Sequence, residues 1–361
     1  MTDSSKLLTL ITGASGFVGA ATALTFLEKG HAVRLPLRSQ AQIDAWKAAH
    51  PQYSEKMDLV LLEGDMAAEG TFDDLVQGCE AVVHTASPAS FTFKTSAEEE
   101  ILKPAVNGVL SLLASASKAK SVKSVVITSS MQAYATNAEL DELRFGKELV
   151  FDENTYHGIT YEEAATFSNE RGHDIYSTSK RASDLAAFDY VTKHKPSFGL
   201  TIASPSFVIG ANPAPVVKHF SDLRTNVGIW LGTVWEKKEF PPQDGSVFRP
   251  IIWVSIADVA LAHFLAATNP AVAGGKRYAL AGGVLSTEQL VRAIVHFQPG
   301  LKGKFPALPE HEVAGEVLVV NGGFKTEMTE KDLGIKWESF EAAVEPFAKQ
   351  LYDLAKADGK V

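Results

Sequence analysis

A tyrosine, a lysine and a pair of serines in this sequence have types and spacing that suit proton transfer to a carbonyl oxygen. Tyr176 and Lys180 are four residues apart in YSTSK, and Ser129 and Ser130 end the segment VKSVVITSS. Residues four apart share one face of a helix, so the lysine ammonium can lie near the phenol and favour its ionised form. A tyrosine pKa of about 10, brought closer to neutrality, makes a usable general acid or base. A serine hydroxyl beside it can donate to the oxygen that develops charge, or it can only cap the next turn.

The Tyr-x-x-x-Lys spacing is not specific by itself, because Tyr352 and Lys356 repeat it in YDLAK. Position separates the two pairs. Tyr176 lies between two predicted strands, whereas Tyr352 lies in a tail after the predicted sheet is complete. We therefore interpret Tyr176 and Lys180 as site residues, and Tyr352 and Lys356 as a solvated helix face.

A glycine-rich turn near the start of the chain predicts a phosphate site. Gly13, Gly16 and Gly19 follow the apolar segment LLTLIT and precede a predicted helix at 17–29. Such a turn directs free backbone N–H groups, at the positive end of a helix dipole, toward one point. The alternative is a turn whose glycines only allow tight packing, and the motif alone leaves it open.

The end of the second predicted strand, HAVRLPLR, indicates which dinucleotide would bind. Proteins that prefer NAD place an acid there for the ribose hydroxyls, and that acid repels a 2′-phosphate. Here Arg38 and Ser39 end the strand, and no carboxylate follows until Asp44. Because a guanidinium grips phosphate in a fork, we predict NADP(H), read by Arg38 and by Ser39; the alternative is an ordinary exposed arginine.

The elements that must position these residues alternate along the chain. After the first strand, apolar strands are expected at 31–38, 57–65, 80–88, 122–130 and 199–210, and helices at 17–29, 40–50, 72–77, 101–118 and 174–193. This alternation is typical of an α/β fold with a parallel sheet. Serines at the carboxyl end of a strand would then face the crevice where such sheets bind ligands. We predict a Rossmann-type doubly wound sheet.

The expected domains are interleaved. Residues 1–205 form an NADP-binding domain with an inserted, irregular loop at 132–173, and residues 206–361 form mainly a substrate-binding region, from which 249–268 returns to the Rossmann sheet. A tail follows and ends in an amphipathic helix at 340–354. Aromatic residues that would line an apolar substrate pocket, unless they are plain core, are Phe91, Phe93, Phe207, Trp230 and Trp235.

Composition excludes several classes of protein. The chain has 361 residues, 45% of them hydrophobic, and its net charge of −9 with scattered basic residues argues against nucleic-acid binding. No signal peptide and no apolar run of membrane-spanning length is expected, so we predict a cytoplasmic protein with no membrane partner. A single cysteine, Cys79, excludes an internal disulfide, and neither it nor the histidine spacing predicts a metal site. The expected assembly is a monomer or a homodimer.

The ordered set of TGASGFVG, a serine-bearing fifth strand and a helical YSTSK resembles the short-chain dehydrogenase/reductase superfamily. The length, the 132–173 insertion and WVSIADVALAH resemble its extended branch. HTASP, KPAVNG, VVITSSMQAYA and FDEN are similar to fungal NADPH-dependent aldehyde/ketone reductases and plant dihydroflavonol reductases.

The resemblance implies roles for individual residues. Ser130 matches the family's catalytic serine better than Ser129, Tyr176 would protonate the carbonyl oxygen, and Lys180 would lower the tyrosine pKa and hold the nicotinamide ribose. Asp65 matches an adenine contact. The implied cofactor turn consists of Gly13, Ser15, Gly16, Phe17, Val18 and Gly19.

The resemblance therefore implies reduction of a small-molecule aldehyde or ketone by NADPH. A sugar epimerase or dehydratase of the same fold is the first alternative; dehydratases usually place acids after the serine, whereas Met131, Gln132 and Ala133 follow Ser130 here. A non-catalytic NADP-sensing regulator is the second. Such proteins generally lack the tyrosine–lysine pair, which is intact in this chain.

Overall fold

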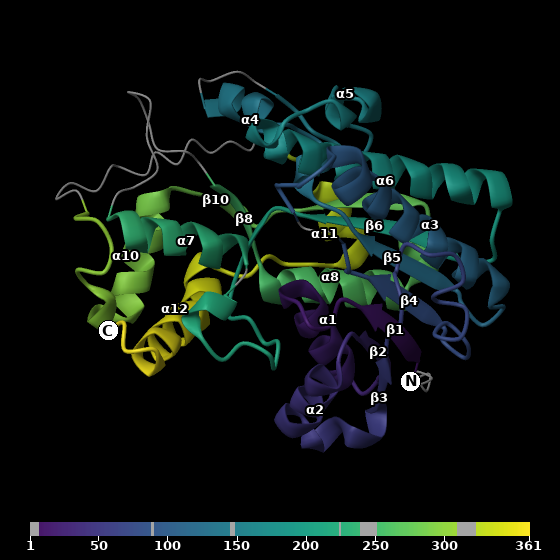
Figure 1. Ribbon diagram of the computed structural model, residues 1–361, viewed down its shortest axis with the longest axis horizontal. Coiled ribbons are helices and arrows are strands. Elements are labelled where there is room, and N and C mark those ends of the chain that lie inside the picture. The colour runs from purple at the N-terminus through teal and green to yellow at the C-terminus, as the bar shows by residue number, and fades with distance from the viewer. Residues whose placement is uncertain (1–6, 88–89, 145–148, 224, 239–250, 309–322) are drawn as a thin grey trace.

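The central sheet of this computed structural model consists, over the described residues, of seven parallel strands in the order β3-β2-β1-β4-β5-β6-β9 (Figure 1). The structure describes residues 7–87, 90–144, 149–223, 225–238, 251–308 and 323–361. The strands are β1 Leu8–Thr12, β2 Ala32–Leu37, β3 Met57–Leu61, β4 Ala81–His84, β5 Ser124–Thr128, β6 Gly199–Pro205 and β9 Lys276–Leu280. The order reverses between β1 and β4, which makes the sheet doubly wound and confirms the predicted fold class.

Helices connect these strands. They are α1 Phe17–Glu28, α2 Gln40–Ala49, α3 Lys103–Lys118, α4 Asn137–Arg144, α5 Tyr161–Ala165, α6 Gly172–His194, α7 Asn226–Lys237, α8 Ile256–Thr268, α9 Pro270–Ala273, α10 Thr287–Phe297, α11 Glu327–Leu333 and α12 Phe340–Ala357. A π-helical turn at Glu98–Leu102 leads into α3, whose Pro104 lies in the first helical turn, where a missing N–H is tolerated.

Both faces of the large sheet are buried, which explains its continuous apolar strands. Successive side chains of a strand point to opposite faces. Val82 and Val125 accordingly pack with α3 and α6, whereas Val83 and Val126 pack with α1 and α8. Figure 1 shows α6 and α8 on opposite sides of the sheet. This sandwich fixes the strand ends, where the site residues lie.

A second, three-stranded sheet belongs to a smaller lobe with α7, α10 and α12 (Figure 1). Its strands, in the order β10-β8-β7, are β7 Phe207–Ile209, β8 Ile251–Ser255 and β10 Gly283–Leu285. The strand expected at 199–210 is therefore divided after Pro205. The prediction that 249–268 returns to the Rossmann sheet is wrong for its strand, because β8 pairs with β7 and β10. Its helix, α8, does return and covers the large sheet.

Two further sequence predictions need correction. Residues 72–77 form turns instead of a helix, because Gly70 and Gly78, both with positive φ, close a segment too short to nucleate a helix. The 132–173 segment is not wholly irregular, since it contains α4 and α5. It also contributes to the core, with Tyr134 0% exposed.

The second tyrosine–lysine pair lies on α12. Lys356 is exposed, as expected, with its Nζ 6.0 Å from the centre of the Tyr352 ring. Tyr352, however, packs on the apolar core of the smaller lobe and so closely on Gly300 that a Cβ there would meet its ring at 2.5 Å. The prediction of a solvated face is wrong for the tyrosine. None of the helices in the described ranges combines the length and the apolar composition that a membrane span requires.

Candidate active site

The glycine turn joins β1 to α1 in a conformation that few other residues permit. Gly13 has φ +76°, and its carbonyl accepts a hydrogen bond from Gly16 N–H at 2.9 Å. A Cβ on Gly19 would overlap the Gly13 carbonyl. The N-cap of α1, Gly16, provides no side-chain cap, and the first turn of α1 holds no acidic residue. The first N–H groups of α1 are therefore left to bind an anion.

A cavity of about 560 Å³ opens at this turn. It extends from the ends of β1, β2 and β4 to α3 and to the smaller lobe, which contributes Val208 and Thr225. The predicted cofactor residues found in its wall are Gly13, Ser15, Gly16, Phe17, Val18, Gly19, Arg38 and Asp65. A cavity of this size, with the glycine turn in its wall, fits a dinucleotide.

Arg38 and Ser39 follow β2 but have different surroundings. Ser39 caps α2, its Oγ accepting from Gln42 N–H at 3.3 Å, so its hydroxyl already serves the helix. Arg38 is exposed in the cavity wall, and only its backbone N–H is bonded, to Gln42 Oε1 at 2.9 Å. Within the described part of the chain its guanidinium has no partner. Arg38 is thus available to bind a phosphate.

Asp65 organises the loop that follows β3. Its Oδ1 accepts from Ala67 N–H at 2.9 Å, and its carbonyl accepts from the Thr71 hydroxyl at 2.8 Å. The side chain is exposed in the cavity wall. The loop bonds thus hold the Asp65 carboxylate in the cavity wall, and its contact with adenine stays a prediction.

Tyr176 and Lys180 lie one turn apart on α6, as predicted. Lys180 Nζ is 5.9 Å from the centre of the Tyr176 ring and donates to the Thr128 carbonyl, at the end of β5, at 3.4 Å. Burial lowers the pKa of Lys180 to about 8. The ammonium of α6 is therefore held at the end of β5, the strand that the two serines follow.

The titration of Tyr176 differs from the sequence expectation. Burial raises the pKa of Tyr176, and a hydrogen bond with the Ser130 side chain acts to lower it. Tyr176 therefore stays protonated at neutral pH. A protonated phenol is the form that a proton donor needs.

The two serines after β5 have separate partners. Ser129 is buried, and its Oγ donates to Asp184 Oδ2 at 2.9 Å. Ser130 begins a 3₁₀ turn, Met131–Ala133, where its Oγ accepts from Gln132 N–H at 3.2 Å, and it also reaches Tyr176. Of the two serines, Ser130 is therefore the one that reaches Tyr176, whereas Ser129 is bonded to Asp184.

Of the aromatic candidates for a substrate pocket, Phe91 lies nearest the chemistry. Its ring centre is 5.1 Å from that of Tyr176 and 4.6 Å from that of His173. Gly172 makes this approach possible, because a Cβ there would overlap the Phe91 carbonyl. Phe93 instead packs in the cluster with Ile175.

The remaining aromatic candidates lie in the smaller lobe. Phe207 packs against its core, and Trp235 contacts the rings of Phe220 and Phe305 at 5.2 and 5.5 Å. Trp230 is on α7, and its side chain lies outside the described part of the structure. The structure thus brings Phe91 to Tyr176 but supports no substrate contact for Phe207 or Trp235.

Several site residues were missed by the sequence analysis. His84, at the end of β4, lines the cavity, and its Nδ1 is 2.8 Å from Thr12 Oγ1. Thr85 donates its hydroxyl to the Thr12 carbonyl at 2.8 Å and lies against the glycine turn. The motif HTASP could have indicated both residues, because its polar side chains lie at and just after the end of a buried strand.

Comparisons with known proteins agree with this geometry. The sequence pattern of the NAD dependent epimerase/dehydratase family matches residues 9–281. An uncharacterized oxidoreductase of Schizosaccharomyces pombe is 31% identical over 353 residues, 97% of this chain and 98% of the relative. The ketoreductase azaE of Aspergillus niger is 30% identical over 344 residues, 93% of this chain and 94% of the relative.

A solved structure shows the same fold. Yeast methylglyoxal/isovaleraldehyde reductase Gre2, in complex with NADPH, superposes with a TM-score of 0.79 at 23% identity. The match covers 98% of this chain and all of the yeast chain, 100%. Both lobes described above are therefore parts of one shared architecture.

Proposed function

The chain belongs to the NAD dependent epimerase/dehydratase family, the extended branch of the short-chain dehydrogenase/reductase superfamily, and from this premise we propose that it is an NADPH-dependent reductase of aldehydes or ketones. One observation carries the proposal: a protonated tyrosine, a serine hydroxyl bonded to it and a buried ammonium meet at the end of β5. The fungal relative named as a ketoreductase and the NADPH complex of the yeast structure support the substrate class and the cofactor.

The cofactor is expected to lie along the cavity wall. The pyrophosphate fits the turn at Gly13, Gly16 and Gly19, where side chains are excluded, and Arg38 would read the 2′-phosphate. When bound, NADPH supplies the hydride that reduces the carbonyl carbon. The side chains of the protein carry out the other steps, which act on the carbonyl oxygen.

These side chains handle the carbonyl oxygen. Ser130 donates to the oxygen and orients it, and Tyr176 then transfers its phenolic proton as negative charge develops there. Lys180, as an ammonium, stabilises the phenolate that remains. The product is an alcohol. Phe91, whose ring centre lies 5.1 Å from that of Tyr176, provides an apolar wall for the substrate.

Arg38→Ala is expected to lower the preference for NADPH over NADH by about 10- to 100-fold, since charge-assisted hydrogen bonds to a phosphate are worth about 1.5–3 kcal/mol. KM for NADPH should rise and that for NADH should stay unchanged in steady-state assays. Lys47→Ala removes an exposed cation of α2, which follows Arg38; Lys47 lies outside the cavity wall, and its variant serves as the control. An Arg38→Ala protein that kept the wild-type preference would overturn this assignment.

A panel of simple aldehydes, ketones and diketones tests the activity itself, with NADPH oxidation followed by absorbance. We expect turnover with NADPH and at least tenfold less with NADH. Saturable NADPH binding without turnover on any carbonyl compound would favour the sensing regulator. Conversion of nucleotide sugars without net cofactor consumption would favour the epimerase or dehydratase; the absence of acids at Met131, Gln132 and Ala133 argues against it. A cytoplasmic location and a monomer or homodimer remain predictions.

A further inference from the structure

A buried ion pair lies beside the catalytic lysine. Asp184, one turn after Lys180 on α6, accepts from Arg277 Nε of β9 at 3.1 Å, and their side chains are only 1% and 2% exposed. Ser129 donates to the same carboxylate oxygen at 2.9 Å. A buried ion pair is seldom worth more to stability than apolar residues of the same volume, so its presence here invites a functional explanation.

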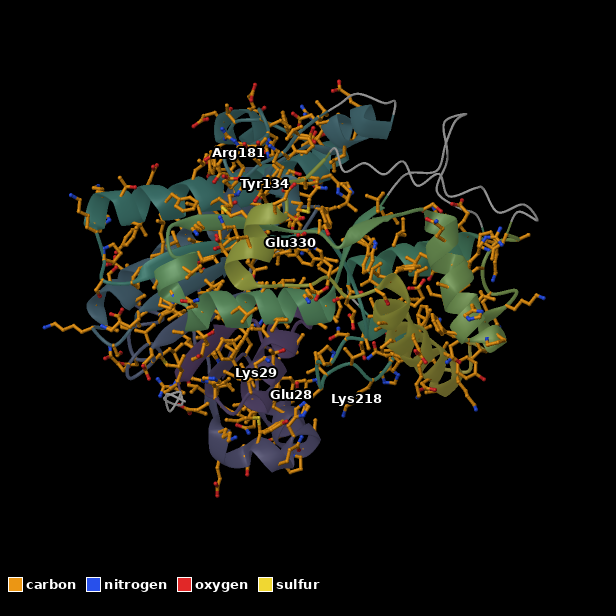
Figure 2. The ribbon with its side chains drawn as sticks, turned by 180° about the vertical axis from the view of Figure 1, so that it is seen from behind. Glu28, Lys29, Tyr134, Arg181, Lys218 and Glu330 are labelled. Carbon is orange, nitrogen blue, oxygen red and sulfur yellow. The ribbon has the colours of Figure 1, made fainter. Side chains whose placement is uncertain are left out.

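The cation of this pair is fixed on several sides. The Arg277 guanidinium lies 3.4 Å from the centre of the Tyr134 ring and 3.9 Å from that of Tyr156, and its Nη1 donates to the Thr155 carbonyl at 2.6 Å. Figure 2 shows Tyr134 on the α6 side of the sheet, away from Glu28 and Lys29 of α1. Arg277 therefore holds the Asp184 carboxylate in one place.

Each member of this ion pair has one side-chain atom that makes no hydrogen bond within the described residues. Asp184 Oδ1 and Arg277 Nη2 are both buried without a hydrogen-bond partner among the described residues. One bond joins the pair where a guanidinium and a carboxylate can form two. Asp184 Oδ1, on the helix that carries Lys180, is therefore not bound by the guanidinium.

Among the described residues, the other titratable groups near Lys180 supply no negative charge. His84, which feels the Lys180 charge from β4, has a pKa lowered by burial to about 3. His263 of α8, whose Nε2 is 2.7 Å from Thr128 Oγ1, has a pKa lowered by burial to about 4. Both are neutral at physiological pH, and Tyr176 is protonated. Asp184 is the group that raises the pKa of Lys180 against the effect of burial.

We propose that Asp184, fixed by Ser129 and Arg277, is a positioning residue that keeps Lys180 charged beside Tyr176. The proposal rests on the proposed function, in which Lys180 acts as a cation. Asp184 itself touches neither substrate nor cofactor and acts through the lysine. Its loss should therefore alter the pH at which the enzyme works more than the rate at its optimum.

The pH dependence of the reductase reaction tests this role. Lys180 must be protonated for this reaction, so activity falls as the pH rises through the pKa of Lys180. Removing the Asp184 carboxylate charge lowers that pKa, and the alkaline limb of the pH–activity profile moves to lower pH. For Asp184→Asn we expect a limb about one pH unit lower, which is about a fivefold loss at pH 8 relative to pH 6. Asp184→Glu, which retains the charge, should restore the limb. A uniform loss at every pH, with the limb unmoved, would show a structural role only.

Matched variants separate this role from damage to the fold. Asp258→Asn changes another buried aspartate whose pKa burial raises, at the start of α8, and should leave the limb in place. If Asp184→Asn does not fold, Asp184→Asn with Arg277→Met removes both buried charges together. This double variant should show the lowered limb as well, and a wild-type limb in it would overturn the proposal.

The lysine can also be observed without turnover. NMR of lysine side chains, with the Lys180 signal assigned through Lys180→Gln, should show Lys180 titrating at lower pH in Asp184→Asn than in the wild type. If the wild type reduces no carbonyl compound but this shift is found, the proposed function fails and the role of Asp184 stands. If the wild type is a reductase and Lys180 titrates identically in both proteins, the role of Asp184 fails alone.

Discussion

Tyr176→Phe is expected to reduce kcat for carbonyl reduction by about 10²- to 10⁴-fold, the contribution of a well-placed general acid. The phenol is the only group of the proposed set that transfers a proton, and its replacement keeps the ring that contacts Phe91. The dissociation constant of NADPH should stay within about twofold of the wild type, because Tyr176 is not in the cavity wall that holds the glycine turn. Single-turnover rates and fluorescence titration with NADPH measure the two quantities.

The chain provides its own control for this substitution. Tyr352→Phe removes a hydroxyl from the other tyrosine that precedes a lysine by four residues, on α12 in the smaller lobe. It should leave kcat unchanged and keep the melting temperature near that of the wild type. Near-full activity of Tyr176→Phe would remove the tyrosine from the mechanism, whatever the other variants show.

Gly19→Ala is expected to weaken NADPH binding by about 100-fold, roughly the loss of one strong charge-assisted hydrogen bond. The new Cβ would overlap the Gly13 carbonyl and approach Thr85 Oγ1 at 2.7 Å, so the turn must open and its N–H groups must move apart. Overpacking of this kind costs about 1–3 kcal/mol of stability. Calorimetric titration with NADPH and a urea unfolding curve measure both effects.

Gly108→Ala is the matched control for this prediction. Gly108 also lines the cavity, from α3, but a Cβ there meets nothing within 4 Å. Alanine in a helix is about 1 kcal/mol more favourable than glycine, so this variant should be as stable as the wild type or more so, and should still bind NADPH. Wild-type affinity in Gly19→Ala would mean that the turn does not hold the phosphates.

The parts of the fold that sequence predicted are those with local causes. The alternation of buried strands and helices, the turn at Gly13 and the helix bearing Tyr176 all depend on neighbours within a few residues. Arg38 was identifiable because it directly follows the apolar residues that end β2. These features need no knowledge of which strand pairs with which.

The parts that sequence missed depend on distant partners. β8 is as apolar as a strand of the large sheet, and only its pairing with β7 and β10 places it in the smaller lobe. Tyr352 looked solvated because Gly300, which receives its ring, is remote in sequence. Asp184 could have been noticed from its position four residues after Lys180, but its partner Arg277 lies 93 residues further on.

That separation has a consequence for the growing chain on the ribosome. The cavity wall from Gly13 to Gly108 and the helix α6 are translated well before β9, and at about 5–20 residues per second Arg277 follows Asp184 by about 5 to 20 seconds. Until β9 pairs with β6, Asp184 lacks its cation, and an uncompensated charge of this kind costs about 3–5 kcal/mol once buried. Nascent chains that end before residue 277 would therefore contain Tyr176 and Lys180 on a helix, α6, that does not yet pack stably against the sheet.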